Sequence, residues 1–435
     1  MNYMNIQNSS FDKSIRVLIV STEYPPMRGG VGRYTENLTK SLVKLGVEVD
    51  VLCNEKGKGN YHGLSPTNQN NSNLIMKVAH DSGADIVHVQ YEHGLYGLKL
   101  NSLNPKRIST NIDSFYHDCK IPIVTTMHSG YTFKQWMGLA RIVQNTCKVG
   151  KYTTLVENYW RRLLNYHSFR NLDRDKVALS KATIVLSHYM QSIIAQYGNY
   201  HGDDRSIFII YHGSQPSSKL ASQPTKEQAR SRFNLPSNKR IAVATGFRTV
   251  TKGWDIIKKM HVPEDWVVVT NSSRNDYSRD SINLQLKKDG VIDLHKDFLE
   301  EEDLSILMYA ADVTILPYTV SSSSGVMFDG FSHGLPFLSS DIDLFKEFSS
   351  QGLGITVKRK PDAFVDGLIT LAKDYDHYQK YVYKFKEQLN WDLIARQHIG
   401  IYRHILSNPM ALVVRSSNSN PTSADVAASC IQTNK

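Results

Sequence analysis

Two successive series of short apolar segments, each followed by a turn and a helix-like stretch, constrain the fold of this chain more than any other feature. The first segment, residues 15–21 (IRVLIVS), is rich in β-branched residues and leads into a glycine-containing turn. Apolar or aromatic residues then recur at helical spacing, at Val31, Tyr34, Leu38 and Leu42. Repeated alternation of strands with crossover helices predicts parallel sheets covered on both faces.

Strand-like segments repeat on both sides of a polar stretch near the middle of the chain. Before that stretch, further strands are predicted at 47–53, 86–90, 121–126, 183–187 and 206–211. After it, strands are predicted at 241–246, 266–270, 291–294, 313–317, 336–339 and 354–357. With 435 residues, the chain is long enough for two domains that each bury a core. The sequence therefore predicts an α/β fold with two Rossmann-like halves.

Local composition places the boundaries around these halves. The connection between them is rich in Ser, Pro, Gln and Lys, and the C-terminal end is polar and low in aromatic residues. The predicted divisions are a flexible N-terminus (1–14), a first Rossmann-like domain (15–214), a solvated linker (215–239), a second Rossmann-like domain (240–390), a terminal helix (391–407) and a disordered tail (408–435).

Charge and hydropathy restrict location and partners. No apolar run reaches the roughly 18 to 20 residues needed to cross a bilayer, and no secretory signal is present, so a cytoplasmic protein is expected. The net charge of +10 favours anionic partners. Nucleic acid is not expected, because no recognisable nucleic-acid-binding module is present. Basic and aromatic residues at 133–176 leave peripheral contact with the cytoplasmic membrane face open; the alternative is helices packed on their own domain.

No metal site is predicted. The four cysteines are widely spaced and form no CxxC pair. Acidic triplets at 173–175, 341–343 and 374–376 have the form of a metal-binding DxD pattern, but we interpret them as solvated or helix-capping acids.

The first glycine turn is a candidate ligand contact. Gly29 and Gly30 lie between a predicted strand and a predicted helix, where backbone N–H groups can approach an anion or a sugar. A plain tight turn is the alternative. The spacing does not fit a dinucleotide fingerprint, because Thr35 stands where the third glycine would be needed. An NAD-dependent enzyme is therefore disfavoured.

Polar side chains also gather where two predicted strands of the first half end. Tyr91, Glu92 and His93 follow one strand, and His128 ends the next strong strand. Ligand sites of open α/β sheets form at the carboxyl ends of strands. These residues are therefore expected to face one cleft, and surface histidines without a function are the alternative.

The second half carries a candidate phosphate site. Arg248 and Lys252 lie between a strand and a helix, where guanidinium, ammonium and helix dipole together can hold a diphosphate. A solvated basic turn is the alternative. Further along, Ser324 and Gly325 precede an amphipathic stretch and can cap it or bind phosphate. Asp329, one to two turns later, is suited to accept hydrogen bonds from ribose hydroxyls.

In their order and spacing, these motifs resemble the retaining GT-B glycosyltransferases of family 4. The resemblance spans residues 17–406. It is carried by YPPMRGGVGRY (24–34), VHVQYEHGLYG (87–97), VTTMHSG (124–130), ATIVLSHYM (182–190), YHG (211–213), the Lys252–Gly253 pair, ADVTILPY (311–318) and GLP (334–336).

The resemblance implies a GT-B fold whose two parallel sheets face a central cleft. The first domain would bind the acceptor, with Tyr91, Glu92 and His93 on that side, and the second would bind the nucleotide-sugar donor. Residues 391–407 would cross back to the first domain. The implied donor contacts are Gly29 and Gly30 to diphosphate and sugar, His128 to the sugar, Arg248 and Lys252 to the diphosphate with Ser324 and Gly325 beside them, and Asp329 to the ribose.

The implied reaction is retaining transfer of a hexose from a nucleotide-diphosphate sugar to an acceptor hydroxyl, with no required metal or cofactor. A glycan, a lipid-linked sugar or a small molecule remains open as the acceptor. In one departure from the family pattern, the usual Glu-x7-Glu motif reads Ser321 and Asp329 here. A catalytically silent sugar-nucleotide-binding or scaffold protein of the same fold is therefore the main alternative, and a sugar epimerase or phosphorylase is another.

Overall fold

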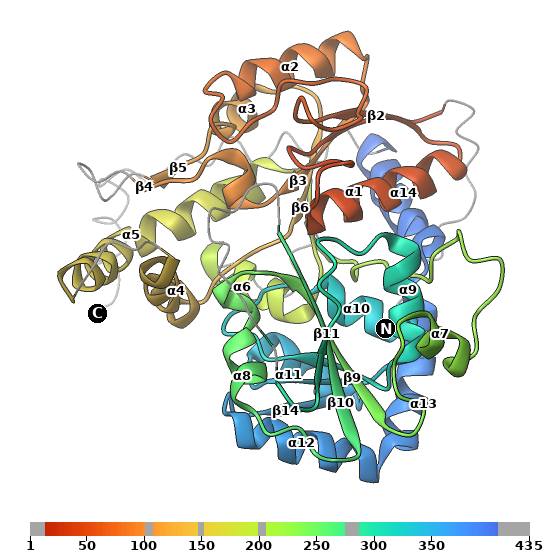
Figure 1. Cartoon of the computed structure of the whole chain (residues 1–435). Helices are drawn as coiled ribbons and strands as arrows, with labels where there is room; N and C mark the ends of the chain where they lie inside the picture. The colour runs from red at the N-terminus through yellow and green to blue at the C-terminus, as the bar shows by residue number, and fades with distance from the viewer. Residues whose placement is uncertain are drawn as a thin grey trace, which may run out of the picture.

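The computed structural model describes residues 14–100, 108–146, 152–198, 206–274, 286 and 288–407. Two six-stranded parallel sheets form two lobes, one above the other in Figure 1. The predicted α/β fold with two Rossmann-like halves is confirmed, and all twelve predicted strands coincide with strands of these sheets. Most of the predicted flexible N-terminus and the whole predicted tail lie outside the described residues.

The inner strands of the first sheet are buried along most of their length, as expected of a parallel sheet covered on both faces. Its order is β2 (Glu48–Leu52), β1 (Arg16–Val20), β3 (Ile86–Tyr91), β6 (Ile123–Met127), β7 (Ala182–Val185) and β8 (Ile207–Ile209). The helices of this lobe are α1 (Gly30–Lys44), α2 (Asn71–Asp81), α3 (Asp113–Asp118), α4 (Phe133–Thr146), α5 (Tyr152–Leu179) and α6 (His188–Gly198). A short ladder of β4 (Lys99–Leu100) and β5 (Ile108–Ser109) and the turn η1 (His93–Tyr96) complete it.

The second sheet has the order β11 (Val291–Asp293), β10 (Trp266–Ser273), β9 (Arg240–Phe247), β12 (Val313–Leu316), β13 (Phe337–Ser340) and β14 (Gly354–Val357). Its larger helices are α9 (Glu301–Ala310), α10 (Gly325–Ser332), α12 (Pro361–Lys373) and α13 (Tyr375–Lys386). Shorter ones are α8 (Trp254–Lys259), α11 (Asp343–Ser349), η2 (Val250–Lys252) and η3 (Glu387–Leu389). If the six strands are numbered by their order in the chain, their spatial order across the sheet is 3-2-1-4-5-6, which is the doubly wound arrangement.

The strand order locates the ligand-binding edge of each sheet. In a doubly wound sheet, ligands bind beyond the carboxyl ends of the two strands between which the direction of winding reverses. These strands are β9 and β12 in the second sheet, followed by the loops that carry Lys252 and Ser324. In the first sheet they are β1 and β3, followed by the turns that carry Gly30 and Glu92.

Part of the segment 215–239 is not the solvated linker that its composition predicts. Helix α7 (Lys226–Arg232) begins with a capping box at Thr225 and Gln228 and packs against α9. Ala229 and Phe233 are buried in the core of the second lobe. Apolar residues at helical spacing within a polar composition explain the difference, and this part of the segment belongs to the second lobe.

The last helix, α14 (Trp391–Ser407), returns from the second lobe to the first. It lies beside α1 in Figure 1, and its Trp391, Ile394 and Tyr402 are buried in the core beneath α1. Tyr402 also hydrogen-bonds His88 inside the first sheet, at 2.7 Å between the hydroxyl and Nδ1. The second lobe is thereby fastened to the first by a second chain crossing, which begins beside the 211–214 connection.

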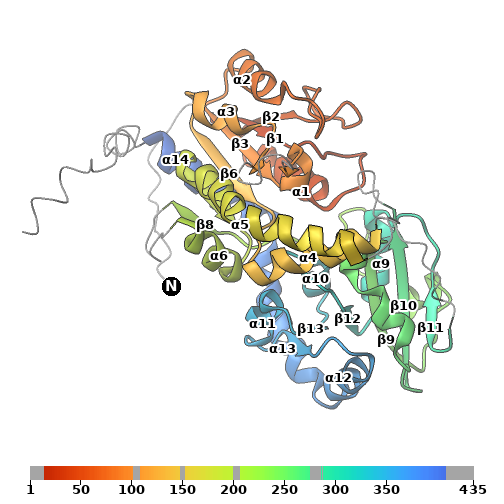
Figure 2. The same ribbon diagram turned by 90° about the vertical axis from the view of Figure 1, so that its left-hand side faces the viewer.

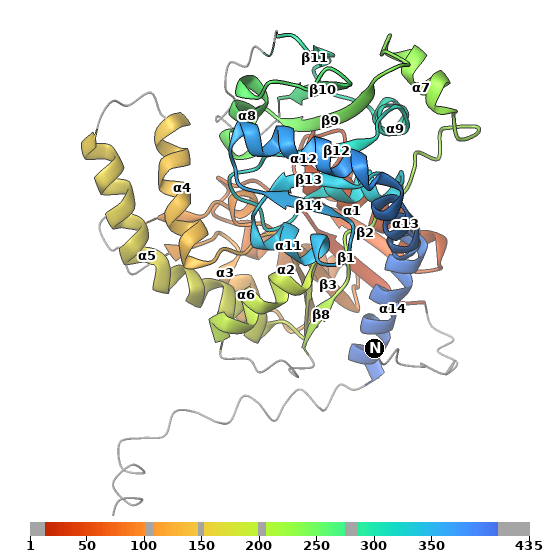
Figure 3. The same cartoon turned by 90° about the horizontal axis from the view of Figure 1, so that it is seen from below.

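Helices α4 and α5 form a hairpin that extends from the first lobe. Figure 3 shows the hairpin at the edge of the molecule, away from both sheets. Among the described residues, no helix combines the length and apolar character that would let it cross a bilayer.

Candidate active site

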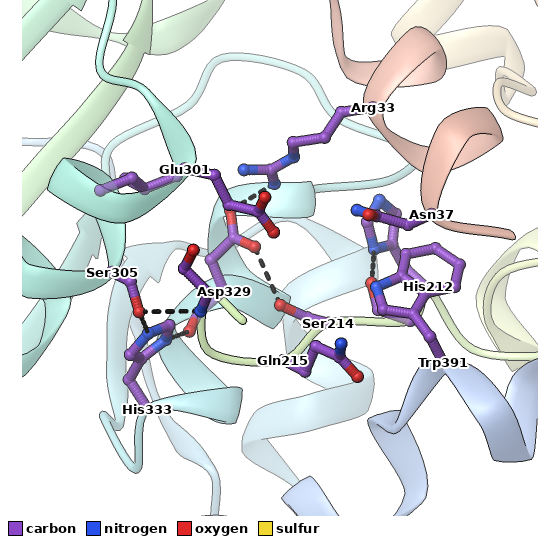
Figure 4. Close-up of a pocket in the computed structure, with 13 residues that line it drawn as sticks. Arg33, Asn37, His212, Ser214, Gln215, Glu301, Ser305, Asp329, His333 and Trp391 are labelled. Carbon is purple, nitrogen blue, oxygen red and sulfur yellow. Dashed lines mark hydrogen bonds and ion pairs between the residues drawn. The ribbon is translucent and has the colours of Figure 1, made fainter. Parts of the chain in front are cut away.

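A pocket between the two lobes is closed by an ion pair. Arg33 of α1 contacts Asp329 of α10, and Figure 4 shows the two side chains meeting across the pocket. The free space inside it is about 20 Å³, enough for about one water molecule. The wall is completed by Asn37, His212, Ser214, Glu301, His333 and Trp391, among others. The lobes are thus in contact at this point.

Asp329 is held by partners from both sides of the pocket. One carboxylate oxygen accepts from Arg33, and the other accepts from the Ser214 hydroxyl at 2.9 Å. Burial opposes ionisation, but the charge and hydrogen bond of Arg33 hold the pKa of Asp329 below its ordinary value. The predicted ribose-binding carboxylate is therefore ionised, and both of its oxygens are already engaged within the protein.

An aromatic cluster connects this pocket with the end of β6. The Tyr34 ring lies edge-on to His128, His212 and Trp391, with centroid distances of 5.0 to 5.2 Å. His212 is also stacked on Phe328. The tight fit depends on Gly213, since a Cβ there would approach the Trp391 ring to 2.6 Å. The YHG motif is thus a packing element between the lobes.

His128 is a neutral imidazole. Burial and the nearby His212 lower its pKa to about 3. Its Nε2 lies 2.9 Å from the Gln90 amide oxygen, which only accepts, so Nε2 carries the proton. Nδ1 then offers a lone pair and can accept a hydrogen bond. At pH 7 this side chain can accept from a hydroxyl, but it cannot supply a positive charge.

The glycine turn at the start of α1 covers the carboxylate of Glu23. Glu23 is buried beneath the turn and accepts the Gly32 N–H at 2.8 Å. Gly29 leaves room for it, because a Cβ there would lie 1.6 Å from the Glu23 Oε1 atom. Gly30, in contrast, is exposed and its Cβ would meet no atom within 4 Å. Glu23 offsets the positive end of α1, so this turn is better suited to hydroxyl groups than to phosphate.

Arg248 and Lys252 lie in the loop after β9. The Arg248 Nε atom donates to the carbonyl and hydroxyl of Ser272, at 3.1 and 3.0 Å, which anchors the guanidinium beside β10. The Lys252 ammonium lies 4.0 Å from the centre of the Tyr318 ring, after β12. A left-handed Gly253, whose Cβ would clash with the Pro317 carbonyl, brings the two loops together. The two predicted cations therefore share the ligand-binding edge of the second sheet.

The N-terminus of α10 lies at the same edge. Ser324 is its N-cap and accepts the Met327 N–H. A Cβ at Gly325 would lie 3.4 Å from His212 and 3.5 Å from Arg33, so this helix end abuts the first lobe. Ser321, at the position of the usual glutamate, donates to the Ser323 carbonyl at 2.7 Å, and its own carbonyl accepts from Gln135 of α4.

The predicted acceptor-side residues are only partly placed to meet a ligand. Tyr91 and His93 are buried inside the first lobe, so the prediction that they contact an acceptor needs correction. Tyr91 is the last residue of β3 and His93 comes just after it. Side chains of α5 cover both residues, which sequence position alone does not reveal. Glu92 is half-buried, and its carboxylate accepts from the Gly94 N–H at 2.8 Å and the Ser129 hydroxyl at 3.3 Å.

His93 belongs to a buried polar network. Its Nε2 lies 2.6 Å from the Asp173 carboxylate of α5, and its Nδ1 lies 2.9 Å from the Ser129 hydroxyl. Burial lowers the pKa of His93, but Asp173 raises this pKa by more than burial lowers it. The net pKa of His93 therefore lies above its ordinary value. Asp173 is fully buried, which corrects its interpretation as a solvated or capping acid.

Residues 28–217 match the sequence model of a family described as Glycosyltransferase Family 4. This part of the sequence, somewhat less than half of the chain, is similar to glycosyltransferase family 4. No curated protein matches the sequence.

Solved structures share the fold of this glycosyltransferase over nine-tenths of its length. Sucrose-phosphate synthase from Thermosynechococcus elongatus is 13% identical with a TM-score of 0.63, covering 90% of this chain and 99% of that one. A glycosyltransferase from Rickettsia africae is 16% identical (TM-score 0.59, 91% and 99%). Anabaena HepE, solved with UDP-glucose, is 14% identical (TM-score 0.58, 91% and 100%). The likeness confirms the predicted GT-B fold.

Four residues that shape the cleft of this glycosyltransferase were not singled out from sequence: Glu23, Arg33, His212 and Ser214. Arg33 follows Gly30 by one helical turn, so its charge on the cleft side of α1 was a usable signal. His212 and Ser214 lie in or beside the YHG motif. Glu23 gave no signal, because its burial depends on the folded turn.

The two glycines of the turn offer a matched test of ligand contact. Gly29→Ala is expected to destabilise the enzyme by about 1–3 kcal/mol, since its methyl group would overlap Glu23. Gly30→Ala is expected to change stability by less than about 0.5 kcal/mol, yet to weaken sugar-nucleotide binding by reaching into open space. Urea denaturation and ligand-induced thermal shifts measure the two effects. Unchanged binding by Gly30→Ala would exclude Gly30 from the donor site.

Proposed function

We propose that this glycosyltransferase transfers a hexose, with retention of configuration, from a nucleotide-diphosphate sugar to an acceptor hydroxyl. The observation that carries the proposal is the ligand-binding edge of the second sheet, because Arg248, Lys252 and the N-terminus of α10 all follow strands that end at this edge. Two cations and a helix N-terminus are suited to a diphosphate. HepE, a fold neighbour solved with UDP-glucose, makes UDP-glucose the first donor to test.

The proposed chemistry is electrostatic. As the bond from the anomeric carbon to the diphosphate oxygen breaks, negative charge grows on the leaving group and the sugar becomes oxocarbenium-like. Lys252, Arg248 and the α10 amides would stabilise the leaving diphosphate. The neutral His128 would accept from a donor-sugar hydroxyl through Nδ1, because its lowered pKa of about 3 excludes it as an acid at neutral pH. No metal or cofactor is needed in this proposal.

The ribose contact proposed for Asp329 requires a rearrangement. Both oxygens of that carboxylate already accept hydrogen bonds, one of them from Arg33 of the opposite lobe. The free space beside it is about 20 Å³, which is room for about one water molecule. We therefore propose that the lobes separate at the Arg33–Asp329 pair when the donor enters, and close again around it.

A thermal-shift screen with UDP-, GDP- and ADP-sugars, each with Mg²⁺ and with EDTA, tests donor binding. We expect one nucleotide class to raise the melting temperature, equally under both conditions. NMR of the product formed from the stabilising donor then reports the anomeric configuration. Inversion at the anomeric carbon would contradict retention, and a shift only with Mg²⁺ would contradict metal independence.

A silent sugar-nucleotide-binding protein is the second candidate, and Ser321 is the observation that favours it. Its hydroxyl is bound to the Ser323 carbonyl, where the family pattern has a carboxylate. Binding without transfer or hydrolysis of any stabilising donor would support this reading. Transfer by the wild-type chain would exclude it. Cytoplasmic residence stays a prediction under either reading.

A further inference from the structure

The hairpin of α4 and α5 carries an unusual concentration of exposed apolar side chains. Ten large apolar side chains are exposed in the described part of the chain, and five of them lie on this hairpin while the others are dispersed. These five are between 45% and 59% exposed: Phe133, Val156, Trp160, Leu163 and Leu164. We call them the hairpin stripe. Exposed apolar side chains gathered on one element in this way are typical of an interaction surface.

The stripe follows the geometry of a helix. On α5, its members stand at 156, 160, 163 and 164, a spacing that places them on one side. The other side of α5 is already used, since Phe169 stacks on Trp136 of α4 at 4.2 Å. Arg162 adds a further link, because its guanidinium lies over the Trp136 ring and its carbonyl accepts the indole N–H. The hairpin is thus held together from within. Phe133 of the stripe contacts the Tyr166 ring of α5, and all five side chains of the stripe stay at least 45% exposed.

The sequence of this part of the hairpin is basic, although one of its arginines, Arg162, is buried against Trp136. Residues 133–164 contain six lysines and arginines and a single acid, Glu157. Lys134 and Arg161 are exposed beside the stripe. A cationic surface with an apolar centre and an exposed tryptophan matches the interfacial region of an anionic bilayer, where apolar groups enter the acyl boundary and cations meet the headgroups.

A second copy of the chain fits this face less well. A symmetric dimer would bring the same patch of both copies together, so that basic residues would oppose basic residues. An anionic bilayer instead offers charge opposite to that of Lys134 and Arg161 beside the stripe. Charge complementarity therefore selects the bilayer.

The hairpin also adjoins the cleft. Gln135, near the start of α4, donates to the Ser321 carbonyl at 3.3 Å, and α4 packs against η2, which carries Lys252. Figure 2 shows α4 and α5 running side by side past the second lobe. A partner that docks on the hairpin stripe would thus lie beside the entrance to the proposed donor site.

We propose that the hairpin stripe docks this glycosyltransferase on an anionic lipid bilayer and that the acceptor hydroxyl belongs to a molecule carried by that bilayer. The first part stands on the stripe and its charge. The second part rests on the proposed function, because it assumes transfer in the adjoining cleft.

Co-sedimentation of the full chain with vesicles tests the docking surface. The vesicles are phosphatidylcholine alone, or phosphatidylcholine with about 30% phosphatidylglycerol. We expect binding to the anionic vesicles at low salt and little to the neutral ones. Leu163→Ser/Leu164→Ser is expected to weaken binding about tenfold or more, since both side chains lose their apolar contact with lipid. The matched control is Ile369→Ser/Leu393→Ser, which removes two exposed apolar residues elsewhere and should bind as the wild type does.

Each remaining outcome overturns the docking proposal. One is no binding to anionic vesicles at low salt, and another is binding that the Leu163/Leu164 variant leaves unchanged. A third is a dimer in light scattering that this variant dissolves without any vesicle binding, which would assign the stripe to a second copy. Melting temperatures of all variants confirm that they fold. Sugar-nucleotide binding, measured without vesicles, separates failure of the proposed function from failure of docking.

Discussion

Lys252→Ala is expected to lower the rate of hexose transfer by about 100-fold or more, which is the cost of removing one preorganised group that stabilises a leaving anion. The fold should tolerate the change, because Lys252 is partly exposed and its ammonium makes a cation–π contact with the face of Tyr318. Initial rates with the donor identified by thermal shift measure the effect.

Variants of Tyr318 sharpen this test, because the ring holds the ammonium in position. Tyr318→Phe keeps the ring and removes a buried hydroxyl that has no hydrogen-bond partner among the described residues, so it should be near neutral. Tyr318→Leu removes the cation–π contact. It should also lower the transfer rate, but by less than Lys252→Ala does. Lys259→Ala, on the exposed side of α8, is the charge-matched control. A Lys252→Ala rate within about twofold of the wild type would refute the diphosphate cradle.

The fold was predictable because parallel strands covered on both faces leave a strong local signal. Segments such as 16–20 and 313–316 are short and almost wholly apolar, and the turns that follow them contain glycine or serine. The ligand-binding edge was predictable for the same reason. Once strands and their order in the chain are known, the residues after them must gather at the carboxyl edge, as Lys252 and Ser324 do.

Contacts between the lobes were not predictable in this way. The Arg33–Asp329 ion pair joins residues almost 300 positions apart. Whether the two side chains meet depends on how α14 and the 211–214 connection set the two sheets against each other. Local periodicity carries no information on that angle. The engagement of Asp329, and hence the rearrangement needed for ribose to reach it, therefore appears only in the folded chain.

Burial of charged residues was the second limit. The triplet 173–175 contains two aspartates with the same local context, yet Asp173 is fully buried against His93 and Asp175 lies toward the surface beside Arg174. On a helix, a difference of two positions turns a side chain by about 200°. The α5 sequence is apolar on more than one side, so its pattern did not reveal which side faces the sheet.

Asp173→Ala is expected to lower the free energy of unfolding by about 3–5 kcal/mol, the usual cost of removing one partner of a buried ion pair. His93 would remain inside the lobe between aromatic neighbours, without the carboxylate that now lies 2.6 Å from its Nε2. Urea denaturation measures the loss. Asp175→Ala is the matched control from the same triplet and should change stability by less than about 1 kcal/mol, since its ion pair with Arg174 is exposed.

The pH dependence distinguishes this ion pair from simple loss of packing. Burial lowers the pKa of His93, but Asp173 raises it above the ordinary 6.5, so the folded state binds a proton more tightly than the unfolded state does. The stability gained from that proton is fully present below about pH 6.5 and is lost as the pH rises through the folded-state pKa. The difference between wild type and Asp173→Ala should therefore be larger at pH 6 than at pH 9. An equal difference at both pH values would mean that the aspartate stabilises α5 by packing and hydrogen bonding to a neutral imidazole, and not as the counter-ion of a buried imidazolium.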